Sequence, residues 1–177
     1  WLAVSYKWNN DNTVLEMKTR ENVFWSDGTP FSAKDVAFTT QIKKKFKALD
    51  TRNSWEYLDE VTAINDSIVQ YKFNRVNVPG FDALATQAIV PKHIWEKVED
   101  PVKFLNPNPV GTGPFTEILR FDNQIWELGK NQNYWQKGKP YVEKLVFPTF
   151  PSNEQVTLAL NSGKLDWAGA FIPAVER

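Results

Sequence analysis

Residues 19–38, TRENVFWSDGTPFSAKDVAF, carry the strongest local signals for structure in this chain. Gly28 can adopt a positive φ and Pro30 cannot continue a strand, so a tight turn is predicted over residues 26–30. Ser32 can accept a hydrogen bond from the next turn and Asp35 can reach back to it, which is the pattern of a capping box. The apolar residues that then recur at helical spacing are Val36, Ala37, Ile42 and Phe46. A strand, a turn and a capped helix from residue 33 to about 47 are therefore expected.

The end of this predicted helix carries three consecutive lysines, Lys43, Lys44 and Lys45. Positive charge at that position suits the negative pole of the helix dipole. The run is interpreted as a solvated helix end rather than as an anion site.

Alternating sequences around this unit predict two antiparallel hairpins. Residues 4–8 and 13–18 flank an Asn-rich turn, and residues 61–64 and 68–73 flank the polar turn 65–67. A short helix is expected over residues 81–86, and Pro91 is placed to begin another.

The clearest break in the chain is the sequence NPNP at residues 106–109, which fits neither a helix nor a central strand. After it, strands are predicted over residues 115–121, 124–130, 142–147 and 165–168, with a helix over 153–161. The expected fold class is α+β, with mixed sheets and flanking helices. The predicted domains are residues 1–105, made of hairpins and the capped helix, and residues 106–177, part of a sheet domain.

Composition excludes several classes of function. Lys and Arg number 21 and Asp and Glu number 21, so bulk charge gives no reason to expect a nucleic-acid or anionic-membrane partner. There is no cysteine, and the one histidine, His93, has no second imidazole to share a metal. Gly111-Thr112-Gly113 lacks the lysine of a phosphate loop, and neighbouring acid pairs point in different directions. No catalytic residue, metal or cofactor is therefore predicted, and the chain is not expected to be an enzyme.

The chain is rich in tryptophan, with 8 such residues. They are suited either to packing or to stacking against the flat face of a ligand such as a sugar. Packing is favoured for Trp25, Trp95, Trp126 and Trp135, whereas both interpretations stay open for Trp55 and Trp167.

Five segments resemble, in order, patterns of the periplasmic oligopeptide-binding proteins, the family 5 extracellular solute-binding proteins of ABC importers. They are residues 20–38, 61–73 (VTAINDSIVQYKF), 111–115 (GTGPF), 133–141 with NYW and GKPY, and 158–166 (LALNSGKLD). A likeness to cello-oligosaccharide-binding members from thermophilic bacteria is also noted.

The resemblance implies part of the large first lobe of a class II (cluster C) periplasmic-binding-protein fold. Because members have two lobes and several hundred residues, it implies a fragment in which the second lobe is absent. It further implies a periplasmic or extracellular location, with membrane association through the transporter. The ligand-binding positions that it suggests are Asn53, Trp55, Thr86, Gln87, Trp167, Gly169 and Phe171.

The predicted function is capture of an oligosaccharide, cello- or otherwise β-linked, and its delivery to an ABC permease in the membrane. One alternative is an oligopeptide- or nickel-binding protein of the same family. An alternative of another class is a glycoside hydrolase-associated module, which predicts turnover. Self-association of a bare fragment through exposed core surface is also expected.

Overall fold

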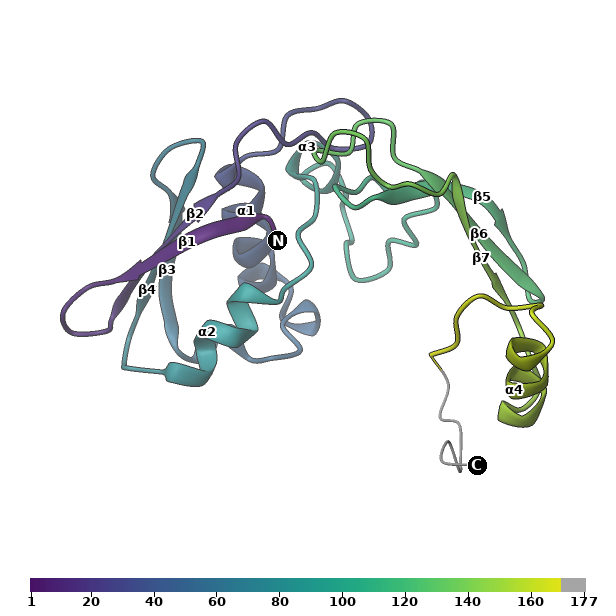
Figure 1. Ribbon diagram of the computed structural model, residues 1–177. Coiled ribbons are helices and arrows are strands. Elements are labelled where there is room, and N and C mark those ends of the chain that lie inside the picture. Colours follow the sequence, from purple (N-terminus) through teal and green to yellow (C-terminus); the bar gives the residue numbers. More distant parts are fainter. Residues whose placement is uncertain (170–177) are drawn as a thin grey trace.

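A four-stranded antiparallel sheet with the strand order β1-β2-β4-β3 forms the N-terminal part of the protein (Figure 1). The structure is a computed structural model and describes residues 1–169. The strands are β1 (Ala3–Trp8), β2 (Val14–Thr19), β3 (Leu58–Ala63) and β4 (Ile68–Phe73). Both expected hairpins are confirmed, since β1 pairs with β2 and β3 pairs with β4.

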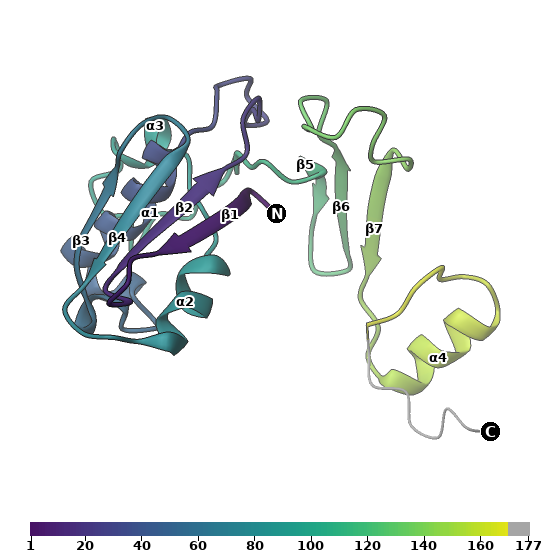
Figure 2. The same cartoon turned by 60° about the vertical axis from the view of Figure 1, so that its left-hand side comes forward.

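Helix α1 (Ala33–Lys45) confirms the capped helix of the opening stretch. The Ser32 hydroxyl accepts a hydrogen bond from the Lys34 N–H, and the Asp35 carboxylate accepts one from the Ser32 N–H at 2.9 Å. Gly28, at φ +86°, makes the preceding turn. α1 lies against β3 and β4, and Figure 2 shows it covering one face of the sheet.

Short helices complete this part of the molecule: the 3-10 turns η1 (Lys47–Leu49) and η2 (Ser54–Glu56), then α2 (Val78–Ala85) and α3 (Lys92–Trp95). α2 begins earlier than residue 81, because the Asn77 side chain accepts a hydrogen bond from the Gly80 N–H at 3.2 Å. Gly80 packs so closely on Tyr57 that a Cβ there would lie 2.7 Å from the ring.

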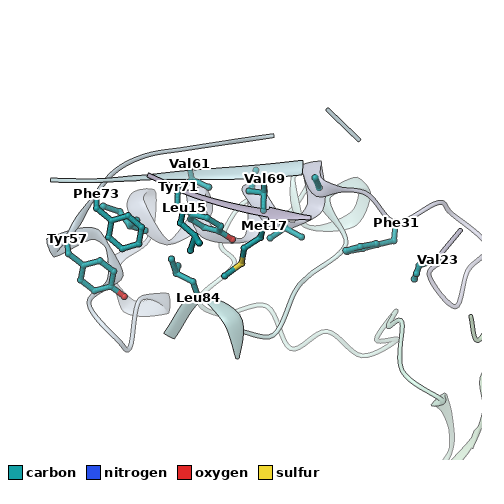
Figure 3. Close-up of a cluster of buried hydrophobic side chains, with 14 of the residues drawn as sticks. Leu15, Met17, Val23, Phe31, Tyr57, Val61, Val69, Tyr71, Phe73 and Leu84 are labelled. Atoms are coloured by element: carbon teal, nitrogen blue, oxygen red, sulfur yellow. The ribbon is translucent and has the colours of Figure 1, made fainter. Parts of the chain in front are cut away.

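The core lies between the sheet and helices α1 and α2. Figure 3 shows Leu15, Met17 and Tyr71 pointing from the sheet toward Leu84 of α2, and all four are buried. Successive side chains of a strand point to opposite faces of the sheet. The other face is therefore largely polar in β2 and β4. There Gln70 donates to Glu16 at 3.0 Å.

β3 contains a register shift between Leu58 and Glu60. The extra residue, Asp59, lets Leu58 and Val61 face the core together although they are three positions apart. This bulge breaks the period-two alternation, and it explains why the sequence pattern predicted the strand only from residue 61.

The second sheet is three-stranded and antiparallel, with the order β5-β6-β7. It contains β5 (Phe115–Phe121), β6 (Ile125–Lys130) and β7 (Lys144–Pro148), followed by α4 (Asn153–Asn161). The Ser152 hydroxyl caps α4 by accepting from the Gln155 N–H at 3.4 Å. The predicted strand over residues 165–168 is wrong, because that segment has no neighbouring strand among residues 1–169 to satisfy its backbone groups.

The turn at Ser26 makes hydrogen bonds to the loops that precede β5 and follow β6. Its N–H donates to the Gly111 carbonyl at 2.9 Å, and its own carbonyl accepts from the Asn133 amide at 3.0 Å. The Arg20 guanidinium lies 4.2 Å from the centre of the Trp135 ring. Within residues 1–169, none of the helices has the length and apolar content that crossing a membrane requires.

Candidate functional site

A groove of about 370 Å³ lies between α1, the segment 49–54 and the residues that follow α2. Two predicted ligand residues, Thr86 and Gln87, line it. Thr86 accepts a hydrogen bond from Arg52 Nη1 at 3.0 Å and donates to the Asp82 carbonyl at 2.7 Å. The Gln87 side-chain carbonyl accepts from Lys43 Nζ at 2.8 Å. Hydrogen bonds within the protein therefore fix the orientation of both side chains.

Asn53 and Trp55 lie beside this groove but do not line it, whereas Ser54 between them does. Asn53 adopts φ 50° at the start of η2. The Trp55 indole N–H donates to the Thr40 carbonyl at 2.8 Å, and Lys44 Nζ lies 4.4 Å from its ring centroid. One face of the Trp55 ring is therefore occupied by a cation, and its donor is used within the protein.

Charged side chains of both signs line the groove. The Asp50 carboxylate accepts from the N–H groups of Ser54 and Trp55 at 2.9 and 3.0 Å. Burial raises the pKa of Asp50, but these hydrogen bonds and the charge of Lys43 outweigh burial and hold it below its usual value. Burial lowers the pKa of Lys43, and the charge of Asp50 offsets this only in part.

A second cavity, of about 630 Å³, lies between β7, α4 and residues 164–169. Trp167 lines it together with Phe147 and Phe150, and the Trp167 side chain is 72% exposed. Gly169 lies against this ring, since a Cβ there would approach Trp167 Cη2 to 3.1 Å. An exposed indole in a cavity that two phenylalanines also line has the apolar, flat character that stacks against the C–H face of a sugar.

The predicted ligand residues are not gathered into one pocket. The two cavities share no lining residue, and Figures 1 and 2 show α2 and α4 on opposite sides of the molecule. Phe171 lies outside the described residues.

The sequence pattern did not indicate that Lys43 and Arg52 line the groove, or that Phe147 and Phe150 line the second cavity. The lysine run was a visible signal for the first of these. Its inner member, Lys43, turns into the groove, while Lys44 and Lys45 are exposed.

Trp25 and His93 have structural roles. Trp25 is buried in the core, and His93 Nε2 lies 2.7 Å from Asp27 Oδ2, which ties α3 to the turn at Gly28. Residues 1–169 contain no group of three or more His, Asp or Glu side chains arranged to hold a metal ion.

The sequence matches, over residues 1–177, the family described as bacterial extracellular solute-binding proteins, family 5 Middle. The chain belongs to this family. Its first-lobe resemblance and its mixed α/β fold with flanking helices agree with that membership. The family is one of transporter solute-binding proteins rather than enzymes.

Curated family 5 relatives are similar along almost the whole chain. The oligopeptide-binding protein AppA of Bacillus subtilis is 27% identical over 184 residues, which covers 99% of this chain and 33% of AppA. The nickel-binding periplasmic protein of Escherichia coli is 26% identical over 186 residues, which covers 94% of this chain and 32% of that protein. The chain thus spans about one third of the length of these relatives.

Among solved structures, a periplasmic oligopeptide-binding protein of Thermotoga maritima with bound mannohexaose has a TM-score of 0.89 and 30% identity. The similarity covers 99% of this chain and 34% of that one. NikZ of Campylobacter jejuni in complex with Ni(L-His) has a TM-score of 0.79 and 26% identity, over 93% of this chain and 33% of NikZ.

Proposed function

We propose that this chain is part of the solute-binding component of a bacterial ABC importer and that its solute is an oligosaccharide. The observation that carries the proposal is the match of the whole chain to family 5, with a mannohexaose-bound member among its structural neighbours. The protein holds its solute and passes it unchanged to a membrane permease. This role places it in the periplasm or outside the cell, at the membrane through its transporter.

The oligosaccharide is proposed to contact two regions. The first is the Trp167 cavity, where the exposed indole supports stacking and the lack of a side chain at Gly169 avoids a close contact with the edge of the ring. Phe171 belongs to the same predicted region of sequence. The second is the groove, with Thr86 and Gln87 in its wall and Asn53 and Trp55 beside it.

Isothermal titration calorimetry of the intact protein tests this proposal. Mannohexaose and cellohexaose are expected to bind, and hydrolysis products are not expected to accumulate. Trp167→Ala should weaken binding about tenfold, the equivalent of about 1.4 kcal/mol. Phe121→Ala is the matched control, because it removes an aromatic ring that is exposed to a similar extent, 74%, but lines neither cavity.

A peptide or nickel-complex binder is the second candidate, and it is favoured by what AppA and NikZ are named for or bind. Mixed tripeptides and Ni(II)-histidine are therefore titrated in parallel. Binding of either, with no heat from both sugars, would replace the oligosaccharide proposal. For this chain by itself we also propose self-association, and a monodisperse monomer in sedimentation velocity would contradict it.

A further inference from the structure

The ammonium group of Lys43 is half-buried in the groove with a neutral hydrogen-bond partner, the Gln87 side-chain carbonyl at 2.8 Å. None of the ten ion pairs among residues 1–169 includes Lys43. Removing a charge from water without a counter-ion in contact is unfavourable. Burial accordingly lowers the pKa of Lys43. The groove therefore contains a cation whose environment an anion would improve.

Arg52 brings a second cation to the same groove. Its guanidinium donates to the Thr86 hydroxyl and lies 3.4 Å from Asp82 Oδ2, in an ion pair whose side chains are both more than half exposed. Exposed pairs of this kind contribute little to stability, so the guanidinium can exchange partners at small cost.

Asp50 also lines the groove, and its charge partly offsets that of Lys43 from beyond ion-pair distance. Its oxygens are engaged by the N–H groups of Ser54 and Trp55 and by the Ser54 hydroxyl, and the residue is 9% exposed. A molecule in the groove thus meets two cations and one carboxylate whose oxygens already accept hydrogen bonds from the protein.

The walls between these charges are largely apolar, with Ile42, Leu49, Leu84 and Trp95 among them. A volume of about 370 Å³ is within the usual range for small-molecule sites. Apolar walls with hydroxyl and amide groups at Thr86 and Gln87 suit a sugar ring, which has C–H faces and polar edges.

We propose that this groove binds a carboxylate of the solute, between Lys43 and Arg52, which makes the solute an acidic oligosaccharide such as a uronic-acid oligomer. The inference rests on the proposed function and specifies its substrate class. Arginine binds carboxylates through two parallel N–H donors and lysine through a point charge, so the two together favour a carboxylate over a neutral hydroxymethyl group.

Two hexasaccharides that differ only at C6 test the inference in the intact protein. Mannohexaose carries hydroxymethyl groups there, and the β-linked hexamer of mannuronic acid carries carboxylates. The acidic hexamer is expected to bind at least tenfold more tightly in 20 mM salt, and this preference should shrink as salt is raised.

The ratio of the two affinities is compared within each variant: Lys43→Met should abolish most of the preference for the acidic hexamer because it removes the charge, and Lys43→Arg should retain it. Lys47→Met is the matched control, because it removes an exposed lysine of the same segment that does not line the groove. Circular dichroism establishes that each variant is folded. If Lys43→Met does not fold, Arg52→Gln takes its place, with the same loss of preference expected.

Equal affinity for the two hexamers, unaffected by Lys43→Met or Arg52→Gln, would overturn the inference and leave the proposed function standing. Binding of a tripeptide or a nickel complex with no binding of either hexamer would overturn the proposed function, and this inference with it.

Discussion

The four-stranded sheet buries the core-facing apolar side chains of β2 and β4, whereas the three-stranded sheet leaves large apolar side chains exposed. All 15 buried residues of the hydrophobic core cluster lie between Leu15 and Leu84. On the second sheet, Trp126 of β6 packs on Phe121 of β5 and on Phe147 of β7, and the three residues are 40%, 74% and 36% exposed. Three strands and one short helix cannot cover such a face, so the second sheet depends on further contacts for its stability.

The largest expected effect follows from this difference. A fragment of residues 1–105 is expected to unfold cooperatively in urea, because it keeps the whole buried cluster. A fragment of residues 106–177 is expected to show no cooperative transition. Circular dichroism with urea titration measures both, and it also tests the predicted division between the two domains.

Cooperative unfolding of residues 106–177 alone would contradict the comparison. It would mean that the second sheet is stable by itself although these aromatic side chains are exposed. Hydrogen exchange of the whole chain provides a control, since amides of β2 and β4 should be protected more strongly than those of β5–β7.

A matched pair of leucine substitutions probes the same difference within one chain. Leu15→Ala removes a fully buried side chain of β2 and is expected to cost about 2–5 kcal/mol of unfolding free energy. Leu158→Ala acts on a side chain of α4 that is 67% exposed and should change stability by no more than about 0.5 kcal/mol. Similar losses for the two variants in urea titration would show that the second region is also closely packed.

The elements that the sequence predicted are those specified by short-range chemistry. The turn at Gly28, the capping box of Ser32 and Asp35, and the Asn-rich hairpin each need only a few neighbouring residues. The bulge at Asp59 and the absence of a strand at residues 165–168 depend on distant partners, and the sequence pattern did not show them.

The candidate site was predictable only in part, for the same reason. Thr86 and Gln87 were expected to contact a ligand, and they do line a groove. The direction in which Lys43 turns is set by packing of α1 against the segment after α2. A lysine run alone does not contain that information.

Two carboxylates extend the comparison to pH. Asp50, in the first region, and Asp122, at the β5–β6 turn, both have pKa values held below the ordinary value of 3.8. A carboxylate whose pKa is lower in the folded than in the unfolded state stabilises the fold at pH values above its unfolded-state pKa. That stability is lost as the pH falls through its folded-state pKa. Acid should therefore weaken the fold through both groups, in the range from about pH 4 downward.

The two groups should differ in size of effect, because Asp50 is buried and Asp122 is open to solvent. Asp50→Ala removes charge-assisted hydrogen bonds to Ser54 and Trp55 and should cost about 2–3 kcal/mol at pH 7. Asp122→Ala serves as the comparison and should cost much less. Urea titration at pH 7 and pH 3 measures each variant against the parent, and the Asp50 difference should narrow at pH 3. An equal loss of stability in Asp50→Ala at pH 7 and at pH 3 would contradict a lowered pKa for Asp50 in the folded protein.

The smallest expected effect concerns the contact between the two regions. Arg20 follows β2 and lies over the ring of Trp135, which belongs to the loop after β6 and packs against the first core. A double-mutant cycle with Arg20→Met and Trp135→Leu should give a coupling of about 0.5–1 kcal/mol. Lys139 and Tyr141 form the control pair. Lys139 Nζ lies 6.0 Å from the centroid of the Tyr141 ring, and Tyr141 is 85% exposed, so the coupling should be near zero.

The size of this coupling decides where the boundary between the two regions lies. Ser26 already bonds to Gly111 and Asn133, so the loops around the second sheet are attached to the first region at several points. A measurable coupling at Trp135 would assign those loops to the first region in energetic terms. The weakly covered part would then be reduced to strands β5–β7 and α4. No coupling would leave the boundary at the NPNP sequence, because the contact between Arg20 and Trp135 would then add no stability across it.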